Sequence, residues 1–218
     1  MTQNEMFDYL YKKTGSATFT AAILGNMKAE SALKATNLQN SYEKKLGYND
    51  ETYTKAVDDG RISAYAFAHD GAGYGLCQWT HWSRKQGLYQ YAKQWKSSIG
   101  CEETQLDFCI TEMQLNYQGL WNRRKDLSLY EATAYVLRQY EKPADQSEEN
   151  VQRRLKLATE ILTEWGKYKT SGDAGEKLHA ILENLENVRQ KMQNLAADCS
   201  QIEAEIYGMI KNMEDVND

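Results

Sequence analysis

One proline, Pro143, is present in a sequence of 218 residues. Proline removes a backbone donor and breaks helices, so its near absence leaves long stretches of chain free to become helical. Val and Ile are few, whereas Ala, Leu, Glu, Gln and Lys are common, and these five residues favour helices. We therefore expect a mainly α-helical protein, and the composition excludes an architecture built mainly from β-sheet.

Hydropathy and cysteine spacing exclude further classes of protein. Hydrophobic residues make up 41% of the chain, which is enough to bury a core at this length. The apolar runs are short and the mean hydropathy is −0.74, so we expect no transmembrane helix and no membrane partner. The cysteines lack C-x-x-C spacing, which favours free thiols, with no disulfide framework, metal site or cofactor. They are Cys77, Cys101, Cys109 and Cys199.

The net charge of −5 is unevenly distributed along the sequence. Residues 173–218 carry ten acidic and four basic side chains, which leaves 21 acidic and 22 basic side chains in residues 1–172. A nucleic-acid-binding domain normally presents a clustered basic surface. We therefore expect no nucleic-acid partner.

A stretch of small residues at 171–175 predicts a linker between a domain at 1–170 and a helix at 176–218. After this linker, apolar residues recur at alternating spacings of three and four, which is typical of a coiled coil. Leu and Met predominate at the a positions and Ile and Val at the d positions, a pattern that favours a homotrimer or homotetramer. The alternative is a helix that folds back onto the first domain. The twelve positions are Leu178, Ile181, Leu185, Val188, Met192, Leu195, Cys199, Ile202, Ile206, Met209, Met213 and Val216.

Within the first domain, apolar periodicity and capping residues predict five helices. Ser16, Ser128 and Ser147 are the expected N-caps of three of them. Two stretches, 36–50 and 59–80, are rich in Asn, Gly, Asp and Tyr and are predicted to be irregular, a feature common in functional loops. The helices are expected at about 17–33, 83–96, 102–117, 128–140 and 147–168.

Glu30 is the first candidate catalytic residue. At about 100° per residue, it falls within about 20° of Phe19 and Ile23 on the apolar face of its helix. A carboxylate in such surroundings loses hydration, so its pKa should rise toward the range in which a general acid works. The alternative is a buried glutamate that is satisfied by an arginine or by backbone donors.

The second candidate is the loop at residues 69–80, HDGAGYGLCQWT. Its three glycines permit left-handed backbone and a close approach by a ligand. Tyr74, Gln78 and Trp79 add an amide and two aromatic rings, which is typical of the wall of a sugar-binding cleft. A tight glycine turn around a packed tryptophan is the structural alternative.

Residues 25–31 (GNMKAES) and 73–80 (GYGLCQWT), followed by Arg84, together resemble the phage tail-type lysozymes of Gram-positive phages and mobile elements. Residues 140–143 (YEKP), followed by Arg153 and Arg154, are similar to the closing segment of that family. The resemblance covers about residues 5–168. The Glu-Ser pair and the G-x-G-L-x-Q loop also resemble goose-type lysozymes and soluble lytic transglycosylases.

The resemblance implies a lysozyme-like helical domain that acts on peptidoglycan. It implies an N-acetylmuramidase that cleaves the β-1,4 bond between N-acetylmuramic acid and N-acetylglucosamine in Gram-positive walls. Glu30 matches the catalytic acid, and Tyr74 and Gln78 match the loop that lines the cleft. We also place Ser31, Trp79 and Glu141 at the substrate.

Glycosidases usually need a second carboxylate. Asp70 is the first candidate, because it lies close to where goose-type enzymes carry a carboxylate that helps to position water. The other candidates are Glu43, Asp50, Glu51 and Glu141.

Two other functions remain open at this point. The first is a lytic transglycosylase on the same scaffold, and the second is a non-catalytic sugar-binding or phage tail structural protein. Residues 1–15 lack the pattern of a secretory signal. We therefore expect a protein made in the cytoplasm that reaches the wall as an endolysin after holin-type release, or as part of a phage tail or virion.

Overall fold

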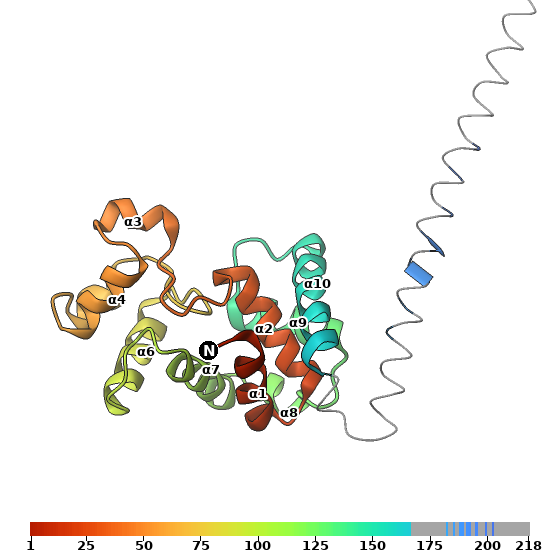
Figure 1. The fold of residues 1–218 in the computed structure, drawn as a ribbon, viewed down its shortest axis with the longest axis horizontal. Helices are drawn as coiled ribbons and strands as arrows, with labels where there is room; N and C mark the ends of the chain where they lie inside the picture. The colour runs from red at the N-terminus through yellow and green to blue at the C-terminus, as the bar shows by residue number, and fades with distance from the viewer. Residues whose placement is uncertain are drawn as a thin grey trace, which may run out of the picture. The chain divides into compact units, whose positions relative to one another are not determined.

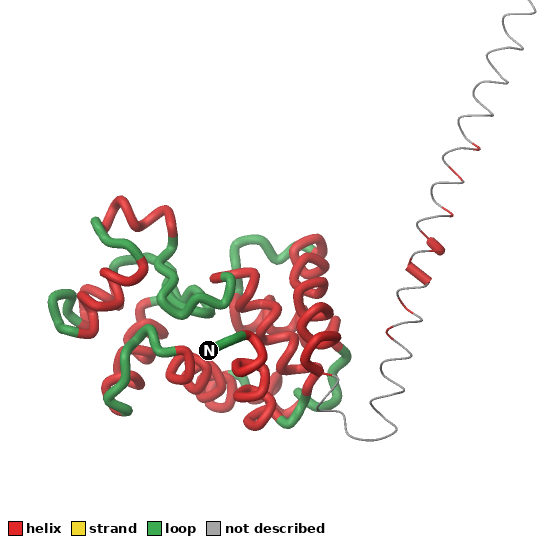
Figure 2. The backbone as a smooth tube through the Cα atoms, viewed as in Figure 1, coloured by secondary structure: helices red, strands yellow, loops and turns green. Residues whose placement is uncertain are grey.

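The computed structural model describes residues 1–166 and nine helical residues between 182 and 202 (Figure 1). The chain divides into two units, Met1–Lys169 and Thr170–Asp218. Helices dominate the described residues of the first unit, as predicted, and no strand is present among them beyond two isolated bridges, Leu38–Tyr74 and Tyr74–Trp79 (Figure 2). No helix among the described residues is long and apolar enough to cross a membrane.

The first unit contains ten α-helices and one π-helical turn, η1, within its described residues. The expected N-caps are confirmed, because Ser16, Ser128 and Ser147 each accept a hydrogen bond from a backbone N–H in the first helical turn. The elements are α1 (Gln3–Thr14), α2 (Ala17–Ser31), α3 (Asn40–Leu46), α4 (Asp50–Asp58), α5 (Ala64–His69), α6 (Trp82–Gln94), α7 (Glu102–Asn116), α8 (Gln118–Arg123), α9 (Leu129–Tyr135), η1 (Val136–Glu141) and α10 (Glu148–Trp165).

The predicted boundaries need three corrections. The helix expected at 17–33 ends at Ser31, because Ala32 and Leu33 adopt left-handed backbone with φ of 52° and 64°. The helix expected at 128–140 changes into the π-helical turn η1 after Tyr135. The stretches predicted to be irregular contain the short helices α3 and α5.

Helix α2 is the centre of one group of helices and contacts α1, α9, η1 and α10. Gly25 permits the close approach of α10, since a Cβ atom at this position would lie 2.7 Å from Ala158 Cβ. A second group contains α3, α4, α5 and α6, and α7 contacts both α1 and α6 (Figure 1). Loop segments run between the two groups (Figure 2).

The second unit has nine described residues, all helical: Leu182, Leu185, Val188, Arg189, Lys191, Met192, Leu195, Cys199 and Ile202. Six of the twelve predicted heptad positions are among them. The linker at 171–175 and the other six heptad positions, Leu178, Ile181, Ile206, Met209, Met213 and Val216, lie outside the described residues.

Candidate functional site

A cleft with a volume of about 1110 Å³ opens where five parts of the chain meet. The end of α2, the start of α3, the segment from the glycine-rich loop into α6, the C-terminal half of α7 and the residues around η1 all contribute to its lining. The lining residues that matter for chemistry are Glu30, Gln78, Arg84, Glu112, Tyr140 and Glu141.

Glu30 lies in the last turn of α2 and lines this cleft. Its Oε1 accepts a hydrogen bond from Nη2 of Arg154, a buried residue of α10, and its side chain is 20% exposed. Arg154 is held in turn by Asn26, whose Oδ1 lies 3.1 Å from Nη1. No other donor among the described residues binds the Glu30 carboxylate, so its Oε2 is left for a proton or a substrate.

The environment of Glu30 differs from the one that its sequence position predicted. Helix α2 is buried on almost every side, and hence it has no single apolar face on which Glu30 could stand. Glu30 reaches the cleft because it lies one residue before the helix ends, where Ala32 and Leu33 turn the chain away. Arg154 is the kind of arginine partner that the alternative interpretation of Glu30 required.

Glu141 is the second carboxyl group of the cleft, at the end of η1. The pKa of Glu141 is raised to about 8, mainly by burial and also by the nearby charge of Glu30, whereas Arg84, Arg154 and a hydrogen bond from Cys77 oppose the shift. The Glu141 side chain is therefore protonated and neutral at pH 7. π-Helical turns occur often at functional sites, and this one ends directly at the carboxyl group.

Glu112 of α7 forms the base of the cleft, and our sequence analysis did not identify it. It is 6% exposed, and its Oε2 accepts hydrogen bonds from Trp79 Nε1 at 2.9 Å and Tyr140 Oη at 2.7 Å. Arg84 donates to both carboxylate oxygens, at 3.0 and 2.8 Å. A carboxylate between the apolar residues Ile110 and Met113 is the signal that could have identified it.

Gln78 lines the cleft, as predicted for the substrate-binding loop. Its Nε2 donates to the Asn37 side chain at 2.8 Å, which leaves Oε1 as a possible acceptor. The glycines before it serve close packing, because a Cβ atom at Gly73 would lie 2.7 Å from Gln78 Oε1 and one at Gly75 would lie 2.5 Å from Gln105 Oε1.

Tyr74, Trp79 and Ser31 do not line the cleft, contrary to our expectation. Both aromatic rings are fully buried, and Tyr74 Oη lies 2.6 Å from Thr54 Oγ1. Ser31 Oγ donates to the Met27 and Leu76 carbonyl oxygens at 3.0 and 2.9 Å, and so it fastens the loop to α2. The structure therefore places these side chains in the packing that holds the loop.

Asp70 is not placed with Glu30 either. Its Oδ1 accepts hydrogen bonds from Lys85 Nζ and from the Ala72 N–H at 2.8 Å, and its Oδ2 accepts one from Tyr53 Oη. Lys85 is fully buried, and Asp70 is not among the residues that line the cleft. Asp70 therefore forms an ion pair with the buried Lys85 and does not line the cleft.

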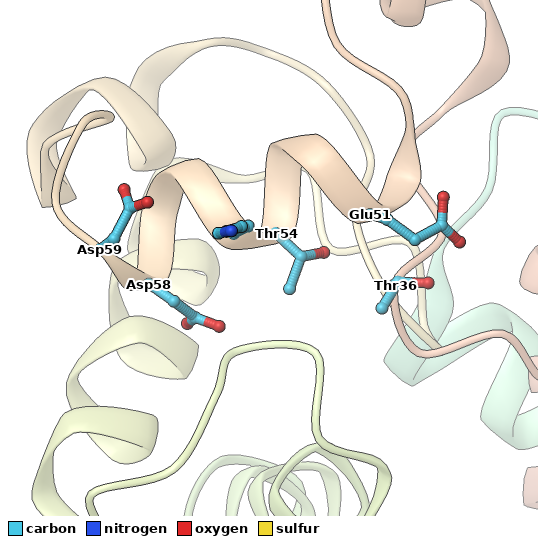
Figure 3. Close-up of a pocket in the computed structure, with 6 residues that line it drawn as sticks. Thr36, Glu51, Thr54, Asp58 and Asp59 are labelled. Carbon is cyan, nitrogen blue, oxygen red and sulfur yellow. The ribbon is translucent and has the colours of Figure 1, made fainter.

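Of the other predicted carboxylates, Glu141 lines the cleft, whereas Glu43, Asp50 and Glu51 do not. Asp50 and Glu51 both bind Lys34, at 2.7 and 2.9 Å, and Glu43 lies on α3. Glu51 lines a separate, open pocket on α4, with Asp58 and Asp59 at its other end (Figure 3). Within the described residues, no group of three His, Cys, Asp or Glu side chains is placed to hold a metal ion.

The comparisons with known proteins give one result. A family model described as phage tail lysozyme matches residues 1–165. This range contains all the residues that line the cleft. Neither the curated proteins nor the solved structures give a match.

Asp70→Asn should destabilise the first unit by about 3–5 kcal/mol, because it leaves the buried Lys85 without its anionic partner. Urea denaturation followed by circular dichroism measures the loss. The double variant Asp70→Asn/Lys85→Met should recover most of the stability, since an apolar side chain tolerates the same site. Full stability combined with lost lysis in the single variant would instead return Asp70 to the catalytic residues.

Proposed function

The chain belongs to the phage tail lysozyme family, and we propose that its first unit is an N-acetylmuramidase with Glu30 as its general acid. The family indicates a lysozyme-like enzyme that acts on peptidoglycan. The proposal also specifies the bond that is cleaved, which is the β-1,4 linkage between N-acetylmuramic acid and N-acetylglucosamine in Gram-positive walls. The observation that carries it is a cleft-lining carboxyl group, Glu30, with one oxygen held by Arg154 and the other open.

Glu30 protonates the glycosidic oxygen as the bond from that oxygen to C1 of the muramic acid breaks. The leaving sugar takes the proton, and Glu30 becomes a carboxylate. Arg154 stabilises this carboxylate through the hydrogen bond to Oε1 and holds the side chain in place. Water then attacks C1 and releases one proton to the solvent, Glu30 takes up a proton again, and the product is a reducing N-acetylmuramic acid end.

Glu141 and Gln78 bind the substrate in this proposal. A neutral Glu141 donates an O–H hydrogen bond to a sugar or acetamido oxygen, and it adds no negative charge beside Glu30. Gln78 Oε1 accepts from a sugar hydroxyl. Ser31, Tyr74 and Trp79 act at a distance by fixing the loop that carries Gln78.

A lytic transglycosylase is the second candidate, and one observation favours it. Among the described carboxyl groups that line the cleft, Glu112 is saturated by donors and Glu141 is protonated, so neither is a free base for water. The 6-hydroxyl of the muramic acid would then attack C1 in place of water, and the product would be an anhydro sugar.

Glu30→Gln should reduce the rate of wall lysis by about 10²–10⁴-fold, because an amide cannot donate the proton that the leaving oxygen needs. Turbidity of Gram-positive cell walls measures the rate, and Glu160→Gln, an exposed change on α10, is the matched control. Mass spectrometry of the muropeptides then identifies the reaction, since reducing ends indicate hydrolysis and anhydro ends indicate transglycosylation. Residual activity above about a tenth of the native rate would remove Glu30 as the acid.

Glu141→Gln should change the pH profile more than the rate at neutral pH. In the native protein, activity should fall as pH rises through about 8, because Glu141 then loses the proton with which it donates a hydrogen bond to the sugar. Glutamine keeps a donor and cannot ionise, so the variant should lack this alkaline decline. The measurement is kcat/KM on solubilised wall fragments across the pH range, and an unchanged alkaline limb in the variant would contradict the role.

We also propose that the second unit joins several copies of the chain through a coiled coil. Five of its described heptad residues, Leu185, Val188, Met192, Leu195 and Ile202, are helical and between 53% and 68% exposed. Apolar side chains in such a row are expected to bind a partner surface, and the same row on a second copy is complementary by symmetry. Several catalytic units on one stalk would increase avidity for the wall.

Multi-angle light scattering of the full chain should therefore give a trimer or tetramer, and deletion of residues 173–218 should give a monomer. The deletion should leave the rate per catalytic unit on soluble fragments unchanged. A full-length monomer at micromolar concentration would contradict oligomerisation and favour a helix folded back on the first unit.

The route to the wall belongs to the same proposal. The family match fits a phage-associated protein that acts on cell walls. We propose delivery by holin-type release or as part of a phage tail.

A further inference from the structure

Four exposed aromatic side chains form a continuous row that begins at the cleft, and we call them the aromatic row: Tyr65, His69, Trp82 and His81. The row spans α5, the loop before α6 and the first residue of α6. His81 lines the cleft together with its neighbours Thr80 and Ser83. The cleft that holds Glu30 therefore continues into an aromatic surface.

The rings are held in a defined arrangement. Tyr65 and His69 stack with centroids 4.1 Å apart and planes 22° apart, and His69 and Trp82 stack at 5.7 Å and 13°. His69 Nδ1 lies 2.9 Å from the Tyr65 carbonyl oxygen, and His81 Nδ1 lies 2.9 Å from Ser83 Oγ. The row is thus organised before any ligand binds, which lowers the entropy cost of binding.

The aromatic row is open to solvent where a ligand could contact it. Tyr65 is 73% exposed and Trp82 is 50% exposed. A centroid separation of 5.7 Å is larger than the contact distance of two rings that lie directly over each other, so Trp82 is offset from His69 and part of its ring face is uncovered.

We propose that the aromatic row is an additional binding site for sugar rings of the same glycan strand that Glu30 cleaves. The apolar C–H face of an N-acetylhexosamine packs well against an aromatic ring, and the row is continuous with His81, which lines the cleft. This inference rests on the proposed function. A short oligosaccharide would fill the cleft alone, whereas a longer one would also contact Trp82 and Tyr65.

The chain offers a matched control in Trp95, which is 64% exposed at the opposite end of α6 and contacts Tyr91 instead of the row. The experiment uses the full chain with Glu30→Gln as the parent, so that ligands survive the measurement. Chitohexaose and chitobiose are titrated by isothermal calorimetry into the parent and into Trp82→Ala, Tyr65→Ala and Trp95→Ala versions of it. Thermal melts verify folding, and Tyr65→Ala serves as the second test because its side chain contributes little to the core.

We expect Trp82→Ala and Tyr65→Ala each to weaken chitohexaose binding by about 3- to 10-fold, the range of one aromatic contact. Chitobiose binding should stay within error of the parent, and Trp95→Ala should bind both ligands normally. Equal chitohexaose affinity in the parent, Trp82→Ala and Tyr65→Ala would overturn the aromatic row as a binding site and leave the proposed catalysis standing. A parent that binds neither ligand would overturn both proposals.

Discussion

The buried carboxylate of Glu112 joins the segments that form the cleft. It binds Trp79 of the glycine-rich loop, Arg84 of α6 and Tyr140 beside the π-helical turn, all through contacts of 2.7–3.0 Å. Removing one partner of such a pair costs about 3–5 kcal/mol, because the other charge is left buried and unpaired. Together with the hydrogen bond from Arg84 Nη1 to the Tyr140 carbonyl oxygen at 3.2 Å, this contact fixes the loop and the π-helical turn next to each other, and with them Glu141.

The number of donors that a carboxylate binds separates structural from chemical roles in this protein. A carboxylate has about four acceptor sites; Glu112 accepts four hydrogen bonds and Asp70 accepts three, so little capacity is left for a substrate. Glu30 accepts from one arginine and Glu141 interacts with one thiol, and both line the cleft. A group whose hydrogen-bonding capacity is only partly used, at an open surface, is the one that can exchange a proton.

The structural features that could be predicted from the sequence are those that depend only on residues close together in the chain. Serine caps and apolar periodicity predicted five of the helices, because both act within one or two turns, but they did not predict the short helices α3 and α5. Glu30 was found by its position in an apolar helix, although Arg154, 124 residues away, could not be inferred from spacing. The burial of Tyr74 and Trp79 depends on which surface the loop packs against, and a loop sequence carries no such information. The role of Glu112 could not be found from spacing because its partners Trp79, Arg84 and Tyr140 lie 28 or 33 residues away in the sequence.

The charges around the cleft explain why Glu141 keeps a proton. Glu30 is matched by Arg154 and Glu112 by Arg84, so each of these carboxylates has a guanidinium within hydrogen-bond distance. Both guanidinium groups also favour a negative charge on Glu141, but burial and the charge of Glu30 outweigh them. A carboxyl group in that position lowers its free energy by taking up a proton, and burial together with the charge of Glu30 drives it to do so. The neutral acid can donate a hydrogen bond to a sugar, and hence the same charge balance that stabilises the fold supplies the cleft with its donor.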